Sequence, residues 1–95
     1  LHNCEAAREH YSELAGILVP DCPDDGTQSR TARFIDRLDE IASASGIPLR
    51  LRDYGIAFEE APVLAREAMK QTRLLINNPC PIEEEDARRL YEAAW

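Results

Sequence analysis

The chain has 95 residues, a net formal charge of −7 and few aromatic side chains. This length predicts one domain over residues 1–95, near the lower limit for a self-sufficient core, which we expect to be built mostly from Leu, Ile and Ala. No basic stripe is present to neutralise phosphates, so the composition argues against nucleic acid as a partner. Apolar runs of transmembrane length and a signal-peptide pattern are also missing, so we expect no membrane partner and a cytoplasmic location.

The cysteines of the chain are Cys4, Cys22 and Cys80, an odd and scattered set without a C-x-x-C spacing. Neither a zinc site nor a disulfide framework fits that spacing, so we expect reduced thiols in an intracellular protein. The chain begins with Leu1 and not with Met. We therefore expect it to be a segment of a longer protein.

The first predicted helix runs from Cys4 to Leu18, with Asn3 as its N-cap. Val19-Pro20 ends it, and the acidic residues, Pro and Gly of 21–26 predict a loop. Apolar residues at helical spacing predict the buried face. These residues are Ala7, Tyr11, Leu14, Ala15 and Leu18.

The second predicted helix covers roughly Gln28 to Ser45, with Thr27 as its N-cap. Gly46 is expected at the C′ position, and Pro48 follows it as is usual after a helix end. The charges of this helix mostly predict a solvated surface. Its apolar face is expected to consist of Phe34 or Ile35, with Leu38, Ile41, Ala42 and Ser45.

The third predicted helix opens at Phe58, has Pro62 near its first position and runs to about Gln71. Before it, residues 49–53 form either a short helical turn or an irregular segment. Its candidate buried residues are Val63, Leu64, Ala68 and Met69.

A final helix is predicted after Pro79 and Pro81, which force the residues before them into extended conformations. Its acidic first turn, 84–86, suits the positive end of the helix macrodipole. Ala87, Leu90, Tyr91 and Ala94 share one face. Since all periodic segments are helical, the predicted fold is all-α: a compact bundle of about four main helices with short connections.

The sequence offers no convincing catalytic, cofactor-binding or metal-binding residues. His2 and His10 are not at i,i+3 or i,i+4 spacing, and Glu5 and Glu9 beside them are typical of a solvated helix surface, so we predict no metal site. Four separated glycines without a preceding strand predict no phosphate-binding turn. No nucleophile is spaced to pair with a base.

Some adjacent carboxylates are interpreted as charges that complement helix starts. They are Asp24-Asp25, Glu59-Glu60 and Glu83 to Asp86.

Four motifs in order carry a family resemblance. Asn-Pro-x-Pro-Ile-x-Glu-Glu-Asp-Ala at 78–87 and Leu-Tyr-Glu-Ala-Ala-Trp at 90–95 resemble the C-terminus of the iron-containing (group III) alcohol dehydrogenases. Gly-Ile-Pro-Leu-Arg-Leu from Gly46, followed by the Leu-Ala-x-x-Ala-like stretch at 64–68, is similar to the family's preceding segments. The resemblance extends from about Ile41 to Trp95. One departure is Cys80, which stands where the family usually has Arg.

The resemblance implies a parent enzyme that transfers a hydride between NAD or NADP and an alcohol or aldehyde, with iron or zinc polarising the substrate oxygen. In the family, the aspartate and three histidines that bind the metal, and the nucleotide site, lie upstream of this segment. The segment is then expected to wall the active-site cleft, to have the remainder of the parent enzyme as its partner, and to be inactive alone. Cys80 is interpreted as a small residue in a tight turn, or alternatively as a thiol facing that cleft.

Two further expectations concern association. The alternative to the dehydrogenase interpretation is an independent small acidic helical module that binds a partner helix. If the chain is an excised segment, apolar side chains near its C-terminal end lose their cover, and we expect the isolated chain to self-associate there. The side chains concerned are Leu74, Leu75, Ile76, Tyr91, Ala94 and Trp95.

Overall fold

The computed structural model describes residues 2–95 and contains five α-helices and two 3-10 helices. No strand occurs among these residues, so the all-α prediction is confirmed. Contacts divide the chain into two compact units, an N-terminal unit that ends at Ile47 and a C-terminal unit from Pro48 to Trp95. Within the described residues, no helix combines the length and apolar character needed to cross a membrane.

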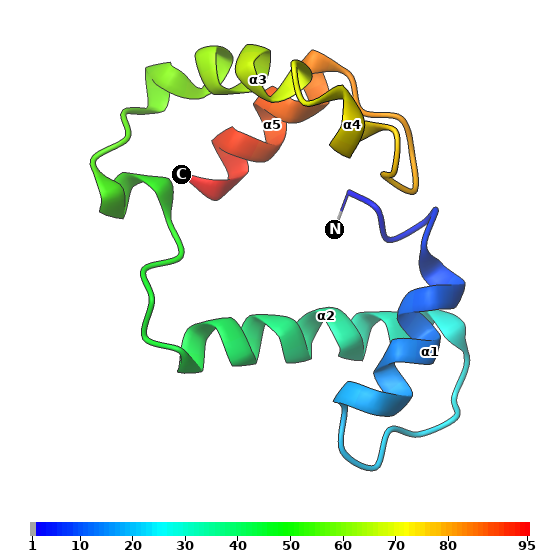
Figure 1. The fold of residues 1–95 in the computed structure, drawn as a ribbon. Coiled ribbons are helices and arrows are strands. Elements are labelled where there is room, and N and C mark those ends of the chain that lie inside the picture. Colours follow the sequence, from blue (N-terminus) through cyan, green and yellow to red (C-terminus); the bar gives the residue numbers. More distant parts are fainter. Residues whose placement is uncertain (1) are drawn as a thin grey trace. The chain divides into compact units, whose positions relative to one another are not determined.

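The N-terminal unit is a pair of helices, α1 (Arg8–Leu18) and α2 (Thr27–Ala44), joined by the predicted acidic loop (Figure 1). Residues 2–7 form turns, so α1 begins four residues later than predicted, within the first turn where helical bonding is weakest. Gly46 has φ 73°, the left-handed conformation expected at C′.

Short side chains fill most of the contact between α1 and α2. Ala7 and Ala15 are buried, and the Tyr11 ring lies 5.3 Å from that of buried Phe34. Leu38 and Ile41, which belong to the predicted apolar face of α2, are each 42% exposed. The buried residues of α2, Thr31 and Phe34, lie in its N-terminal half, and a pair of helices buries only a narrow stripe of each partner.

The C-terminal unit begins with two 3-10 helices, η1 (Leu51–Tyr54) and η2 (Phe58–Glu60). The long α-helices α3 (Ala61–Met69) and α5 (Glu84–Ala94) then pack against each other, with the single turn α4 (Thr72–Leu75) between them in the sequence (Figure 1). The predicted third helix is therefore two pieces, with η2 leading into α3, and the separate turn α4 begins just after its predicted end. Pro62 is near the start of α3, as expected.

Alanines form the contact between α3 and α5. Ala61, Ala65 and Ala87 are buried, whereas the predicted buried residue Val63 is 48% exposed. Leu90, which shares a face of α5 with Ala87, is 43% exposed. Alanine lets two helix backbones approach closely, so that larger side chains on either side of the contact line remain partly in water. The core prediction for Val63 is therefore wrong.

Trp95 closes the C-terminal unit. Its indole N–H donates to the Ile56 carbonyl over 2.9 Å, and its ring meets that of Phe58 edge-on at 5.5 Å. The Arg52 guanidinium lies 5.5 Å from the centroid of the indole. Nearby, Arg50 donates to the carbonyl of Ala93 over 3.0 Å, which satisfies one of the free carbonyls at the end of α5.

Candidate functional site

The segment between α4 and α5 carries the most specific sequence motif, and it surrounds a hollow. The side-chain amide of Asn78 donates to the Cys80 carbonyl over 2.6 Å and lies 3.6 Å from the Cys80 sulfur. The hollow has a volume of about 380 Å³, and Leu75, Ile82 and Cys80 contribute to its lining. The thiol is thus half-buried in a largely apolar surrounding within the C-terminal unit.

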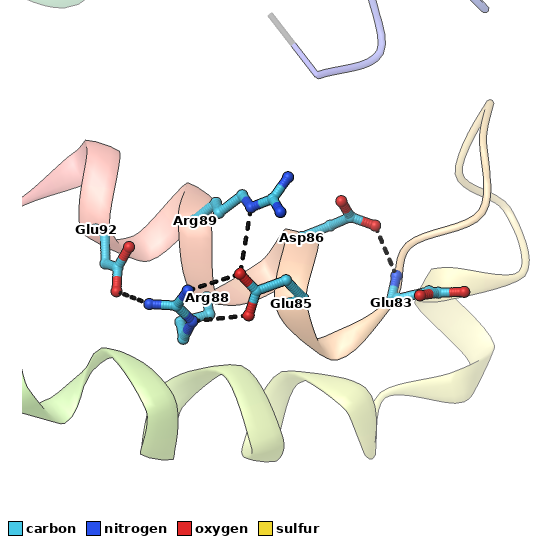
Figure 2. A network of polar contacts seen from close by, with 6 residues as sticks. All are labelled: Glu83, Glu85, Asp86, Arg88, Arg89 and Glu92. Carbon is cyan, nitrogen blue, oxygen red and sulfur yellow. Dashed lines mark hydrogen bonds and ion pairs between the residues drawn. The ribbon is translucent and has the colours of Figure 1, made fainter.

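The helix α5 starts where the sequence predicts, and its acidic first turn helps to fix that start. The Asp86 carboxylate accepts a hydrogen bond of 3.1 Å from the backbone N–H of Glu83 (Figure 2). This bond satisfies a backbone donor that the helix itself leaves free. These carboxylates have a structural task, as interpreted from the sequence.

A chain of charges then continues along α5 (Figure 2). Arg88 donates to both carboxylate oxygens of Glu85, at 2.6 and 2.8 Å, and also pairs with Glu92. Arg89 reaches Glu85 at 3.3 Å. The hydrogen bonds from Arg88, followed by its charge and by the contact with Arg89, outweigh partial desolvation and lower the pKa of Glu85 to about 2. The same pairing raises the pKa of Arg88.

The other two carboxylate pairs also take part in structural contacts. In the loop before α2, Asp25 accepts a bidentate pair from Arg33 at 2.5 and 2.7 Å, and these bonds hold the pKa of Asp25 below its usual value. Before α3, the Glu60 carboxylate accepts from the backbone N–H of Ala57 over 2.9 Å. None of these carboxylates is poised as an acid–base pair.

The sequence analysis weighed histidines as metal ligands and glycines as a phosphate-binding turn. His2 and His10 are exposed, and residues 2–95 contain no group of three or more His, Cys, Asp or Glu side chains that could hold a metal ion. Gly16 is inside α1 and the other glycines are in turns outside any strand–turn–helix unit. The three cysteines are free thiols.

The sequence analysis missed one structural contact, made by Arg30. Arg30 donates through Nε to the Ser12 carbonyl and hydroxyl, at 3.1 and 3.2 Å, and through a terminal nitrogen to the Pro23 carbonyl at 3.2 Å. It therefore ties α1, the loop and α2 together. The sequence contains no signal for this contact, since two of its three acceptors are backbone carbonyls and Ser12 lies 18 positions away.

Comparisons with known proteins identify the family of the chain. Residues 1–95 match the Fe-containing alcohol dehydrogenase family, C-terminal. Long-chain-alcohol dehydrogenase 1 of Geobacillus thermodenitrificans (strain NG80-2) is 36% identical over 63 residues, which are 66% of this chain and 16% of that relative. No solved structure matches the chain. The chain therefore covers a small part of its relative's length, and it belongs to the Fe-containing alcohol dehydrogenase family, within that family's C-terminal region.

Proposed function

We propose that the chain helps to wall the active-site cleft of an NAD- or NADP-dependent, metal-containing alcohol dehydrogenase in the cytoplasm. The observation that carries the proposal is the family match over residues 1–95. Among the described residues, no group of three or more His, Cys, Asp or Glu side chains could hold the metal. The reacting groups of the enzyme would then belong to the remainder of the parent protein. This segment would shape the cleft and exclude water from it. Alone, the chain is inactive.

A chimera tests the proposal. The Geobacillus relative would be prepared intact, without the region that matches this chain, and with that region replaced by residues 1–95. Because a missing wall lets water into the cleft and removes packing, the truncated protein should lose alcohol oxidation, and the replacement should restore it. A replacement carrying Ala65→Asp, which puts a charge into the α3–α5 contact, is the matched control and should stay inactive.

Full activity of the truncated relative would contradict a role in the cleft. A direct check on the isolated chain is calorimetric titration with NAD and with NADP. The titrations should be flat, and saturable binding tighter than about 1 mM would reveal a nucleotide site in this segment.

Self-association of the isolated chain belongs to the same proposal. Leu74 and Ile76 are 68% and 82% exposed. Such exposure is expected for side chains that another part of the enzyme covers. Trp95, in contrast, is partly buried by Phe58 and contributes less to that surface. Light scattering over a wide range of dilutions should show a mass that falls toward the monomer, and Leu74→Ser with Ile76→Ser should shift the equilibrium to the monomer. A monomeric mass at every concentration would contradict this part of the proposal.

A further inference from the structure

A second hollow lies within the N-terminal unit, between the start of α1 and the exposed side of α2. Its volume is about 290 Å³, and its lining includes the short or apolar residues Thr31, Ala32 and Ile35 beside three charged ones, Glu5, Arg8 and Asp36. That volume is at the lower end of the range for small-molecule sites, so the hollow suits a group of few heavy atoms.

The charges around the hollow do not balance. Arg8 is paired with Glu5, and the cations that neighbour Asp36 along α2 are also engaged, Arg33 with Asp25 and Arg37 with Glu40. Asp36 makes no hydrogen bond or ion pair with any described residue. One uncompensated carboxylate therefore stands at the rim of an otherwise neutral, partly apolar hollow.

The geometry points to a binding site for a cationic head group on a short aliphatic stem, with Asp36 as the counter-charge and Ala32 and Ile35 as the surface for the stem. A primary ammonium group on a stem of a few carbons has this chemistry, and it is shared by free alkylamines and by a lysine side chain. The apolar wall favours burial of the stem, while the carboxylate at the rim leaves the head group partly hydrated.

Nuclear magnetic resonance of the ¹⁵N-labelled 95-residue chain tests the site, with n-butylammonium as the probe. The amide signals of Ala32, Ile35 and Asp36 should shift saturably, with a Kd on the order of 10 mM for so small a ligand. The uncharged n-butanol should bind measurably more weakly. Equal binding of the two probes would overturn the assignment of Asp36 as counter-charge, and a lack of saturable shifts with either would overturn the site.

Three variants with exposed substitution sites separate charge from shape. Asp36→Asn should weaken n-butylammonium about fivefold, the effect expected for an exposed ion pair. Asp39→Asn removes the same charge from α2 outside the hollow, and its effect should be clearly smaller because screening weakens distant charges. Ala32→Leu keeps the charge but fills the hollow, and binding should be lost. If both Asn variants behave alike, or if Ala32→Leu binds normally, the inference is wrong.

A second probe distinguishes the two sources of this chemistry. Lysine blocked at both ends presents only its side-chain ammonium group, attached to a bulky backbone. If it binds as n-butylammonium does and responds equally to Asp36→Asn, the site accepts a protein lysine. If only n-butylammonium binds, the site is for a free amine.

Discussion

The N-terminal unit joins its two helices by polar contacts between distant residues, whereas the ion pairs of the C-terminal unit run along single helices. Thr31 donates to the Arg8 carbonyl 23 positions away, and Arg30 reaches Ser12 across 18 positions. On α5, the pairs of Glu85 with Arg88 and Arg89 are one helical turn long. Side-chain hydrogen bonds between distant residues therefore reinforce the packing of α1 on α2 in the first unit. In the second unit the ion pairs support single helices, and alanine packing, Trp95 and the bond from Arg50 to the Ala93 carbonyl hold the tertiary structure.

The loss of the Phe34 ring should give the largest loss of stability, because it removes the main aromatic contact of the N-terminal unit. Phe34 is 8% exposed and stacks near Tyr11, so Phe34→Ala should lower the free energy of unfolding by about 3 kcal/mol, measured by denaturant titration. Ile17→Ala on α1 is the control, because Ile17 is 84% exposed and its loss should change stability by less than about 0.5 kcal/mol. Equal effects would mean that α1 and α2 do not pack through this ring.

Removal of the Trp95 ring should have the next largest effect on stability. It tests the C-terminal unit, because Trp95 joins distant parts of that unit. Trp95→Ala removes the ring contact with Phe58 and the bond to the Ile56 carbonyl, and should destabilise the unit by about 2 kcal/mol. Trp95→Phe keeps an aromatic ring and should recover about half of that loss. If the two variants were equally unstable, the hydrogen bond alone would account for the anchor.

The polar cross-link of the N-terminal unit is tested by Thr31→Val. The variant keeps the shape of the buried side chain but cannot donate to the Arg8 carbonyl, so stability should fall by about 1 kcal/mol. Thr72→Val in α4 is the control, since Thr72 is exposed. Thermal unfolding followed by circular dichroism would compare the two, and an unchanged Thr31→Val would contradict the importance of distant polar contacts in this unit.

The smallest effect is expected for Glu85→Gln on α5, and it depends on pH. The folded-state pKa of Glu85, about 2, is below the ordinary glutamate value of 4.5, so its pairs stabilise the folded chain fully above pH 4.5 and lose this contribution as the pH falls toward 2. The variant should therefore be less stable than the parent chain at neutral pH, with the difference vanishing in acid. Glu84→Gln removes a charge from the same turn without losing an ion pair, and its difference from the parent should vary less over this range.

Much of the local structure could be predicted from the sequence. The left-handed Gly46 after α2, the acidic start of α5 and the interruption by Pro79 and Pro81 follow from the preferences of single residues and their neighbours. The pairs of Glu85 follow from helical spacing in the same way. Family membership was predicted too, since it depends on short motifs and their order, and the comparison over residues 1–95 confirms it.

The tertiary structure decided which side chains are buried and which polar groups meet. Helical periodicity shows which residues share a face, but it does not say how wide a stripe the partner helix covers. Only the pairing of α3 with α5 places Ala65 inside and leaves Val63 partly exposed. The contacts of Arg30 and Trp95 end on backbone carbonyls, and every residue in the chain has one. The sequence therefore determined the helices and the family, and only the folded chain determined these partners, because they depend on which carbonyls come within reach in space.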